Sequence, residues 1–362
     1  MLKTQKKLLT AFGVKTKEKG LWSEVPVSDK SQLRKARVPT VFSELRVTSG
    51  STGDPLYIFY SKEALHSFVK RAVISLKKSG VSRKNRVLNL FAYGNYVPGS
   101  MYEKACQLED IPIIPLGAPN TYPKEKMVEV ILKLKPDVWL AVPSYAISLL
   151  ELLPKGDDKI LPKKVIVAGE RLLDSYIEKF KEYNVEVINH FGLTECPAIG
   201  VSKKGNPKII EIINDDIYTE SVEENGLQHF VVTDLNNSAT PIIRYKTGDV
   251  IDTIKYNKDG TLAEFRIVGR SDDLTKIQGI LVSKTKIIET LSGITDTFIV
   301  DIKTVDGRDF VEVTLPKALE AKESVIDAQL PFLKKRKLIF KEEVVVPKTS
   351  SYKNKHIIDS RK

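Results

Sequence analysis

The segment TSGSTGDP, residues 48–55, combines glycines and hydroxyl side chains in a way that suits phosphate binding. Its glycines permit tight backbone turns, and its hydroxyls and backbone amides can donate to phosphate oxygens. It is not a Walker loop, because Gly53 is followed by Asp54 instead of a Lys-Ser/Thr pair. A plain surface turn uses the same residue types, so the segment by itself leaves both interpretations open.

A second segment, NHFGLTECPAIG at residues 189–200, places a hydroxyl and a carboxylate directly after a predicted strand. Phe191 can stack on a base there, and Glu195 can hold a magnesium ion. A loop with an incidental acidic residue would have the same composition. Cys196 has no obvious base partner and is interpreted as a small packing residue.

A third segment, TPIIRYKTGDVI at residues 240–251, predicts a strand that breaks at Gly248 and exposes Asp249. A carboxylate fixed by a turn can accept hydrogen bonds from both hydroxyls of a ribose. A simple hairpin turn would also place Thr-Gly-Asp at this position, so the segment alone does not separate the two.

Two further segments are charged. GRSDDLTKIQGI, residues 269–280, contains Arg270 and two aspartates, and a charged linker would look similar. The tail VPKTSSYKNKHIIDSRK contains Lys353 and Lys355. A lysine in such a run is by default a solvated charge, and it reaches a phosphate or carboxylate only when the tail folds over an active site.

Residues 56–192 alternate between short apolar runs and longer segments with apolar residues at helical spacing, which predicts an α/β domain built on a largely parallel sheet. In such sheets the loops at the carboxyl ends of the strands carry the chemistry. The predicted strands are 56–60, 87–92, 111–117, 137–142, 164–169 and 185–192, and the predicted helices are 64–76, 99–109, 124–135, 144–153 and 172–183.

After residue 225 the pattern changes to strands and turns, which predicts a β-rich subdomain with strands at 227–235, 240–256 and 262–270. A small α+β module follows, with helices at 283–293 and around 323–337, a hairpin within 297–315 that turns at Asp306-Gly307, and a strand at 342–347. We therefore expect an N-terminal domain over residues 1–271 and a C-terminal domain over residues 272–362.

Composition narrows the class of protein. With 362 residues and 42% hydrophobic content, the chain can bury a sizeable core. Its two cysteines, far apart in sequence, indicate neither a disulfide framework nor a cysteine zinc site, and we expect a cytoplasmic protein without a secretion signal or membrane span. The net charge of +11 is concentrated in residues 331–362, where ten lysines and arginines stand against three acidic residues.

This basic tail suits nucleotide phosphates, an acidic partner protein, or simply a solvated lysine-rich face. No zinc-finger spacing, RNA-binding aromatic signature or long basic run favours nucleic acid.

Taken in order, the five segments resemble the motifs of the adenylate-forming superfamily of acyl-CoA ligases. Within it the chain is most similar to the phenylacetate-CoA ligase branch, because TPIIRYKTGDVI, VPSYAISLLELL, VAGERLL and IIDSRK resemble blocks of that branch. The resemblance runs from about residue 45 to the terminus. It implies a large adenylate-forming N-terminal domain, of parallel sheets with helices plus a β-rich subdomain, and a small, mobile α+β C-terminal domain.

The resemblance also implies roles for individual residues. The β and γ phosphates of ATP would be bound by Ser49, Gly50, Ser51, Thr52 and Gly53. Phe191 would stack on adenine beside Gly192, Thr194 would touch the α-phosphate, and Glu195 would hold magnesium. Asp54 stands where the branch usually has a lysine.

In the later motifs, Asp249 would bind the ribose hydroxyls and Arg270 would assist at the nucleotide. Asp272 would be the hinge between the two domains. Lys353 would be the catalytic lysine that stabilises the adenylation transition state, with Lys355 as the alternative position, because the segment SSYKNK lacks the glycine that usually fixes this register.

The implied reaction uses ATP and Mg²⁺ to convert a carboxylic acid into an acyl adenylate, which then forms a thioester with coenzyme A. Loading the phosphopantetheine thiol of an acyl carrier protein is the alternative, and a degenerate nucleotide-binding protein is a third interpretation. Transfer through a C-terminal cysteine is disfavoured because no cysteine follows Cys196. Phe91, Tyr93 and Tyr145 hint at an aryl or medium-sized apolar acid, and a homodimer is left open.

Overall fold

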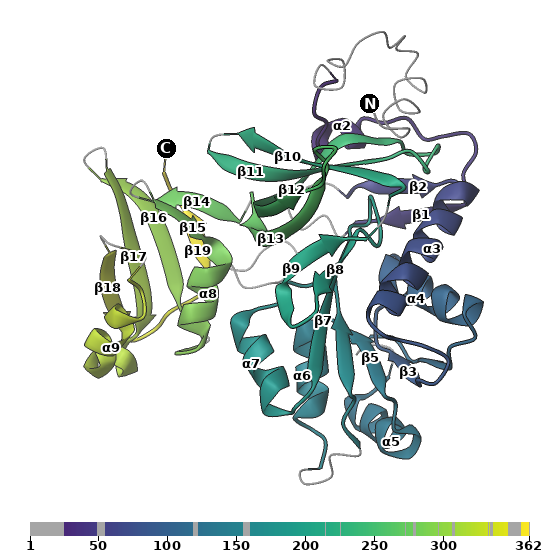
Figure 1. Cartoon of the computed structure of the whole chain (residues 1–362). Coiled ribbons are helices and arrows are strands. Elements are labelled where there is room, and N and C mark those ends of the chain that lie inside the picture. Colours follow the sequence, from purple (N-terminus) through teal and green to yellow (C-terminus); the bar gives the residue numbers. More distant parts are fainter. Residues whose placement is uncertain are drawn as a thin grey trace. The chain divides into compact units, whose positions relative to one another are not determined.

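The computed structural model describes residues 25–48, 55–118, 122–154, 160–213, 215–224, 226–271, 273–277, 280–295, 297–305, 308–331, 333, 336–346 and 356–361. The chain divides into two compact units, Met1–Val268 and Gly269–Lys362, coloured from purple to green and from green to yellow in Figure 1. The boundary expected from the sequence was 271/272.

The first unit is organised around one mixed sheet, which has eleven strands among the described residues. In spatial order these are β10 (Ile217–Glu224), β11 (Leu227–Asp234), β12 (Ile242–Tyr256), β13 (Leu262–Arg270), β9 (Asn206–Ile212), β8 (Gly200–Lys203), β7 (Glu186–Phe191), β6 (Lys164–Val167), β5 (Val138–Ala141), β3 (Val87–Asn89) and β4 (Ile113–Pro115). The strands from β4 to β7 are parallel, and the pairing of β7 with β8 begins the antiparallel half.

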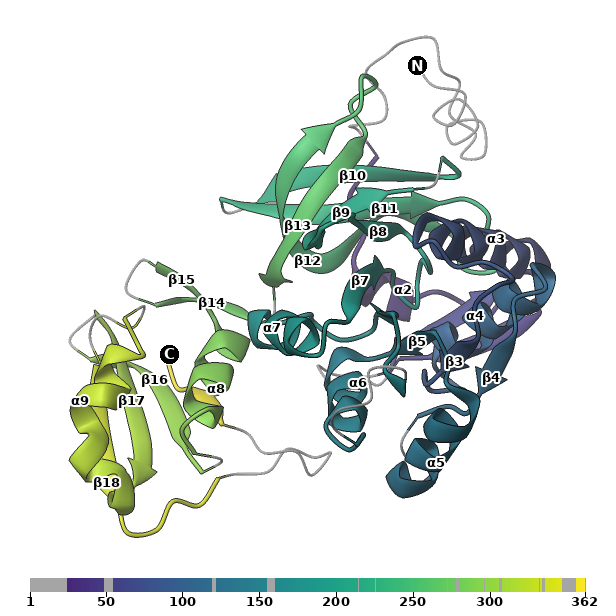
Figure 2. The same cartoon turned by 60° about the horizontal axis from the view of Figure 1, so that its bottom comes forward.

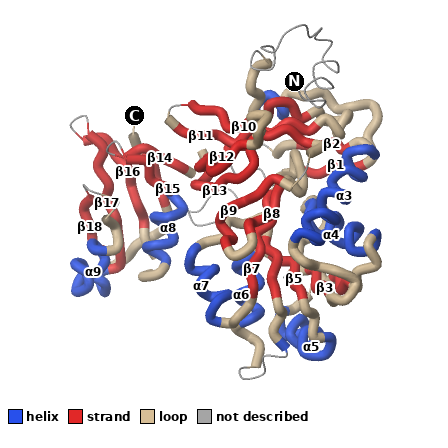
Figure 3. Tube along the Cα trace, viewed as in Figure 1, coloured by secondary structure: helices blue, strands red, loops and turns tan. Residues whose placement is uncertain are grey.

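The helices of this unit are α2 (Lys30–Arg34), α3 (Lys62–Lys78), α4 (Val97–Leu108), α5 (Lys124–Leu134), α6 (Pro143–Leu150) and α7 (Asp174–Glu182). An antiparallel pair, β1 (Glu44–Val47) and β2 (Tyr57–Tyr60), precedes α3. Ser61 begins α3, since its hydroxyl accepts the Ala64 amide. Figure 3 shows the alternation of helices and strands that the sequence predicts for residues 56–192.

Alternate residues of the parallel strands face two separate apolar cores, as the pleat of a strand requires. Val138 and Leu140 pack with α3 and α4 on one face, whereas Trp139 and Ala141 pack with α5, α6 and α7 on the other. Figures 1 and 2 show α3 beside α4 and, away from them, α6 beside α7. Both faces of the parallel half are therefore covered, which is why β5 is a continuous apolar run and β6 is apolar after its first residue.

The antiparallel half differs from the sequence prediction in two ways. The sequence places its start after residue 225, whereas the structure has three further strands, β8, β9 and β10, and the antiparallel half begins at β8. The expected break at Gly248 is also wrong, because β12 runs without interruption through it and Asp249 is buried rather than exposed. Gly248 has φ +85°. Between the pairs His229–Val250 and Val231–Lys246, β11 advances by two residues and β12 by four, so β12 bulges near Gly248 instead of ending there.

The second unit contains a four-stranded sheet in the order β18 (Arg336–Lys341), β17 (Arg308–Pro316), β16 (Ile299–Val305), β19 (Ile357–Asp359). It also contains the pair β14 (Leu274–Ile277) and β15 (Ile280–Ser283), helices α8 (Lys284–Ser292) and α9 (Glu323–Ala328), and the 3-10 helix η2 (Lys317–Lys322). β16 pairs antiparallel with β17 up to Val305 and Arg308, which confirms the predicted strand pairing, whereas the predicted turn at Asp306-Gly307 lies outside the described residues.

Two expectations for this unit are wrong. The helix around 323–337 ends at Ala328, three residues before Pro331, which cannot continue an α-helix hydrogen-bond ladder. The strand lies at Arg336–Lys341 and not at 342–347, because Leu338 and Phe340 pack against the apolar core of this unit while residues 342–346 have no strand pairing. None of the helices in the described parts of the chain is both long and apolar enough to cross a membrane.

Candidate functional site

The segment between β7 and β8, residues 192–199, forms a tight turn where the sheet changes from parallel to antiparallel. We refer to it as the 192–199 turn. The Leu193 amide donates to the Cys196 carbonyl over 3.0 Å, and the Ile199 amide donates to the Phe191 carbonyl over 2.8 Å. A Cβ on Gly192 would lie 2.6 Å from the Ala198 nitrogen, so only glycine permits this close approach.

Two tyrosine hydroxyls hold the 192–199 turn from opposite segments. Tyr60, at the end of β2, donates to the Thr194 carbonyl. Tyr245, on β12, donates to Oε1 of Glu195 over 2.6 Å. Both rings are buried, and the Glu195 side chain is only 6% exposed. Burial, together with the nearby Glu195 charge, raises the pKa of Tyr60, so its hydroxyl remains a donor.

Tyr245 also links the 192–199 turn to Asp249. Tyr245, Thr247 and Asp249 alternate along β12, and all three are buried. The Thr247 hydroxyl donates to Oδ2 of Asp249 over 2.9 Å and accepts the Asp249 amide over 3.1 Å. The second and third sequence segments thus come together in one unit, with a carboxylate held by neighbouring hydroxyls in each.

Phe191 lies in an aromatic cluster. Its ring meets Phe230 edge to face at a centroid distance of 5.3 Å, and it meets Phe265 in the same way at 5.4 Å. Edge-to-face contacts of this kind fix the position of a ring. The ring of Phe191 is 8% exposed, and its proposed stacking on adenine remains a prediction.

His190 precedes Phe191 and is buried in a chain of polar contacts. Its Nε2 lies 2.7 Å from the Ser79 hydroxyl, and its Nδ1 lies 2.6 Å from the Tyr102 hydroxyl. Because the Ser79 hydroxyl donates to the Ser75 carbonyl, Nε2 carries the proton and Nδ1 accepts from Tyr102. Burial lowers the pKa of His190 to about 3, so the ring is neutral near pH 7.

The remaining predicted residues lie in the second unit, outside the described residues or, for the proposed acyl pocket, in the first unit. Arg270 ends β13 and belongs to the second unit. The proposed phosphate loop (Ser49, Gly50, Ser51, Thr52 and Gly53, with Asp54), the hinge Asp272, and Lys353 and Lys355 lie outside the described residues. Of the proposed acyl-pocket residues, Phe91 and Tyr145 are buried in the two apolar cores of the first unit, and Tyr93 is half-buried.

Sequence reasoning missed Tyr60 and Tyr245 as site residues, because both were assigned only to strands. Tyr245 carried a usable signal, since it lies four residues before Asp249 and an even spacing puts two residues on the same face of a strand. Tyr60 carried no such signal, because its partner is a backbone carbonyl 134 residues away in sequence.

The donor set of the 192–199 turn suits magnesium. Within the described residues no group of three or more His, Cys, Asp and Glu side chains could hold a metal ion by itself. Magnesium at nucleotide sites typically uses one or two carboxylates and takes its other ligands from phosphates and water. Glu195, a single carboxylate positioned by Tyr245, matches that requirement.

The sequence matches the AMP-binding enzyme family over residues 14–220, more than half of the chain. Among characterised relatives, the phenylacetate-coenzyme A ligase of Pseudomonas putida is 25% identical over 259 residues, which cover 68% of this chain and 58% of the relative. That of Escherichia coli K12 is 26% identical over 267 residues, covering 68% and 59%. The matched region therefore spans about 58% to 60% of the length of these relatives.

Solved structures confirm the predicted fold class. A 2-hydroxyisobutyryl-CoA ligase, in its postadenylation state with 2-HIB-AMP, superposes with a TM-score of 0.70 at 18% identity, covering 99% of this chain and 84% of that one. The O-succinylbenzoate coenzyme A synthetase of Bacillus subtilis, in complex with AMP, superposes with a TM-score of 0.61 at 17% identity, covering 86% and 67%. Both belong to the class of CoA ligases that the sequence motifs resemble.

Because His190 is buried, we expect the free energy of unfolding to depend on pH. The unfolded chain binds a proton near pH 6.5, whereas the native ring does so only near pH 3, so the unfolded state is favoured as the pH falls through this window. We expect the native state to be about 2 kcal/mol less stable at pH 5 than at pH 7 through this group alone. Urea unfolding at both pH values measures the difference.

His190→Gln should reduce this pH dependence by about the same amount, since the titrating group is gone. His66→Gln is the control, because it removes an exposed histidine of α3 in place of the buried one. An unaltered slope in the His190 variant would contradict the assignment.

Proposed function

The chain belongs to the AMP-binding enzyme family, and from this membership we propose that it uses ATP to activate a carboxylic acid as an acyl adenylate and then forms a thioester with coenzyme A. The acid is proposed to be an aryl or medium-sized apolar one, in line with the phenylacetate-coenzyme A ligases among its relatives. The proposal covers the whole reaction, whereas the matched region covers only part of those relatives.

The observation that supports this proposal best is the hydrogen bond of 2.6 Å from Tyr245 to Glu195. It connects the segment that carries Thr194 and Glu195 to the strand that carries Asp249. These are the residue types needed at an α-phosphate, a magnesium ion and a ribose. A surface turn with incidental acidic residues would not bury two carboxylates beside hydroxyl donors.

In the first half-reaction, an oxygen of the substrate carboxylate attacks the α-phosphorus of ATP, and pyrophosphate leaves. The protein has little covalent work in such a transfer, so its residues act by positioning and by stabilising charge. Thr194 would contact the α-phosphate and Asp249 would hold the ribose hydroxyls. Glu195 would hold Mg²⁺, which when bound neutralises phosphate charge.

In the second half-reaction, the thiol of coenzyme A attacks the acyl carbon, and AMP leaves. We propose that Lys353 serves the first half-reaction and that the C-terminal domain, residues 272–362, rotates about Asp272 before the second. The thiol of a carrier-protein phosphopantetheine is the alternative acceptor, and a product assay with purified coenzyme A and carrier protein distinguishes the two.

We also propose a cytoplasmic location. Cys106 and Cys196, the only cysteines of the chain, are both buried and unpaired with each other. Free thiols of this kind are ordinary in a reducing compartment.

The proposed function is tested by incubating the purified chain with ATP, Mg²⁺ and a panel of aryl, fatty and amino acids, and measuring the release of pyrophosphate. Release that depends on one class of acid supports the proposal and identifies the substrate class. Nucleotide binding without pyrophosphate release for any acid would favour the degenerate nucleotide-binding protein instead.

Asp249→Ala should weaken ATP binding by about 10- to 150-fold for each ribose hydroxyl bond that is lost, because each charge-assisted hydrogen bond of this kind contributes about 1.5 to 3 kcal/mol. Titration calorimetry with ATP measures the affinity. Asp252→Ala is the matched control, since Asp252 lies on the same strand but is exposed and pairs with Arg266. Equal affinities in both variants would remove the ribose assignment.

Glu195→Gln should raise the Mg²⁺ concentration needed for half-maximal pyrophosphate exchange by about 10-fold or more, because a neutral amide is a poorer magnesium ligand than a carboxylate. The amide oxygen can still accept from Tyr245, so the fold should persist. Glu211→Gln, on β9, is the control, since its carboxylate pairs with Lys78. A Mg²⁺ requirement that is the same in all three proteins would exclude Glu195 as the ligand.

Lys353→Ala should reduce acid-dependent pyrophosphate exchange by about 100- to 1,000-fold, because the variant loses a charge at the transition state. Thioester formation from supplied acyl adenylate should change much less. Lys355→Ala is made in parallel, since it tests the alternative register. If exchange is unchanged in both variants, neither lysine has the proposed role.

A further inference from the structure

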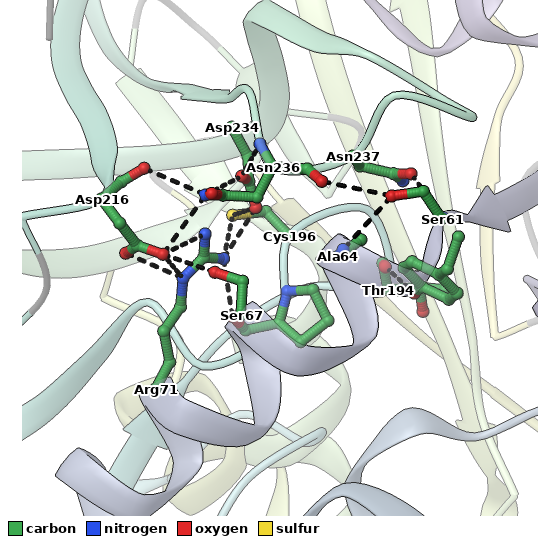
Figure 4. A network of polar contacts seen from close by, with 12 residues as sticks. Ser61, Ala64, Ser67, Arg71, Thr194, Cys196, Asp216, Asp234, Asn236 and Asn237 are labelled. Carbon is green, nitrogen blue, oxygen red and sulfur yellow. Dashed lines mark hydrogen bonds and ion pairs between the residues drawn. The ribbon is translucent and has the colours of Figure 1, made fainter. Parts of the chain in front are cut away.

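Arg71 lies on α3 with 1% of its surface exposed, in the middle of a polar network that none of the proposed catalytic roles uses. Figure 4 shows its guanidinium pointing away from the helix toward Asp216, Asp234 and Cys196. These partners come from the loop before β10, the end of β11 and the 192–199 turn. One side chain therefore contacts three segments that are distant in sequence.

The contacts of Arg71 use its planar fork. Nε donates to both carboxylate oxygens of Asp216 over 2.9 Å, whereas Nη2 lies 2.8 Å from Oδ2 of the same residue as an ion pair without hydrogen-bond geometry. Nη1 donates to Oδ2 of Asp234 over 2.7 Å. Burial opposes ionisation of Asp234, but the Arg71 guanidinium outweighs it and holds the pKa of that carboxyl below its ordinary value. A lysine could not make this set of contacts, since its ammonium has no fork.

The same guanidinium reaches the 192–199 turn. Nη1 lies 3.5 Å from the Pro197 carbonyl and 3.7 Å from Sγ of Cys196, and that thiol in turn lies 3.6 Å from Oδ2 of Asp234. Burial and the Asp234 charge raise the pKa of Cys196, so it stays a thiol. Cys196 and Pro197 directly follow Glu195 in the chain. Arg71 thus contacts the backbone within two residues of the proposed magnesium ligand.

A second set of contacts ties the beginning of α3 to the same region. Ser61 caps α3. Its hydroxyl donates to the Asn236 carbonyl, and its backbone amide donates to Oδ1 of Asn237. Asn236 itself donates to Asp216 and Asp234. Tyr60, the last residue of β2 and the one before the Ser61 cap, donates to the Thr194 carbonyl, so the segment that leads into α3 also contacts the 192–199 turn.

From this geometry we infer that Arg71 is a positioning residue, which holds the 192–199 turn against α3 and so fixes where Thr194 and Glu195 lie. The inference rests on the proposed function for its consequence in catalysis. The anchoring of the 192–199 turn by Arg71 does not depend on that function. Two carboxylates and one guanidinium in a buried site also explain why the position requires a forked cation.

Hydrogen exchange of the full chain tests the anchoring directly. In Arg71→Lys, which keeps the charge and loses the fork, the Leu193 and Ile199 amides should exchange about 10-fold faster or more, because the turn opens more often. Val73→Ala is the matched control, since it removes buried volume from the same helix without a polar contact to the turn. Its effect on those two amides should stay within about 3-fold of the wild-type chain.

Asp216→Asn provides a second variant in case Arg71→Lys does not fold, because the Asp216 side chain is one-third exposed and tolerates an amide. It should accelerate exchange at the same two amides by a smaller factor. Unchanged exchange in the variants, or equal acceleration in Val73→Ala, would overturn the inference, since both results mean that the network only stabilises the fold.

Kinetics provides the second readout. In Arg71→Lys, kcat for acid-dependent pyrophosphate exchange should fall by about 10- to 100-fold, with KM for ATP changed less than about 3-fold. The reason is that misplaced groups weaken the stabilisation of the transition state more than they weaken substrate binding. A rise in KM alone, with kcat retained, would contradict the positioning role. If the wild-type chain has no exchange activity, the proposed function fails, and hydrogen exchange still decides the inference about Arg71.

Discussion

The close contact between Gly192 and Ala198 is the constraint on which the rest of the first unit depends. It allows the chain to reverse direction within a few residues, and that reversal converts a parallel sheet into an antiparallel one. Helices cover both faces of the parallel half, whereas the antiparallel half encloses an aromatic core around Phe191, Phe230 and Phe265. The junction is also where side chains from both halves can meet.

Buried charge is the second theme of this junction. Carboxylates away from water are stable only when cations or hydroxyl donors compensate them, and breaking a buried pair typically costs about 3 to 5 kcal/mol. Glu195 is compensated by Tyr245, and Asp234 is compensated by Arg71. Both arrangements contact the 192–199 turn. Such networks restrict the conformations of the backbone that carries them, which is what a site for a highly charged ligand requires.

Much of the fold could be predicted from the sequence, because apolar periodicity reports directly on burial. The runs at 137–142 and 164–169 are apolar after their first residue because both faces of these strands are covered, and they form β5 and β6. Strands β9 and β10 were missed because their partly exposed, charged residues weaken that signal, and β8 was missed because it has only four residues. Apolar spacing alone extends the last predicted helix to residue 337, whereas Pro331 limits it, and α9 ends at Ala328.

The candidate site was predictable only in part. The motif residues Thr194, Glu195 and Asp249 could be found because their types and order resemble a family. Tyr60, Tyr245 and Arg71 could not be found in that way, since each acts through a tertiary contact with a partner between 50 and 163 residues distant. A spacing rule can place Tyr245 on the face of Asp249, but no local rule places Arg71 beside Asp234.

The bulge at Gly248 has a consequence for how this region tolerates changes in length. On β12 the bulge adds two residues relative to β11, so the alternation of faces is preserved across it, and both Tyr245 and Ile251 reach the same core. An insertion or deletion of one residue here would turn every side chain beyond it to the opposite face. A change by two residues would instead keep both the aromatic core and Asp249 in register.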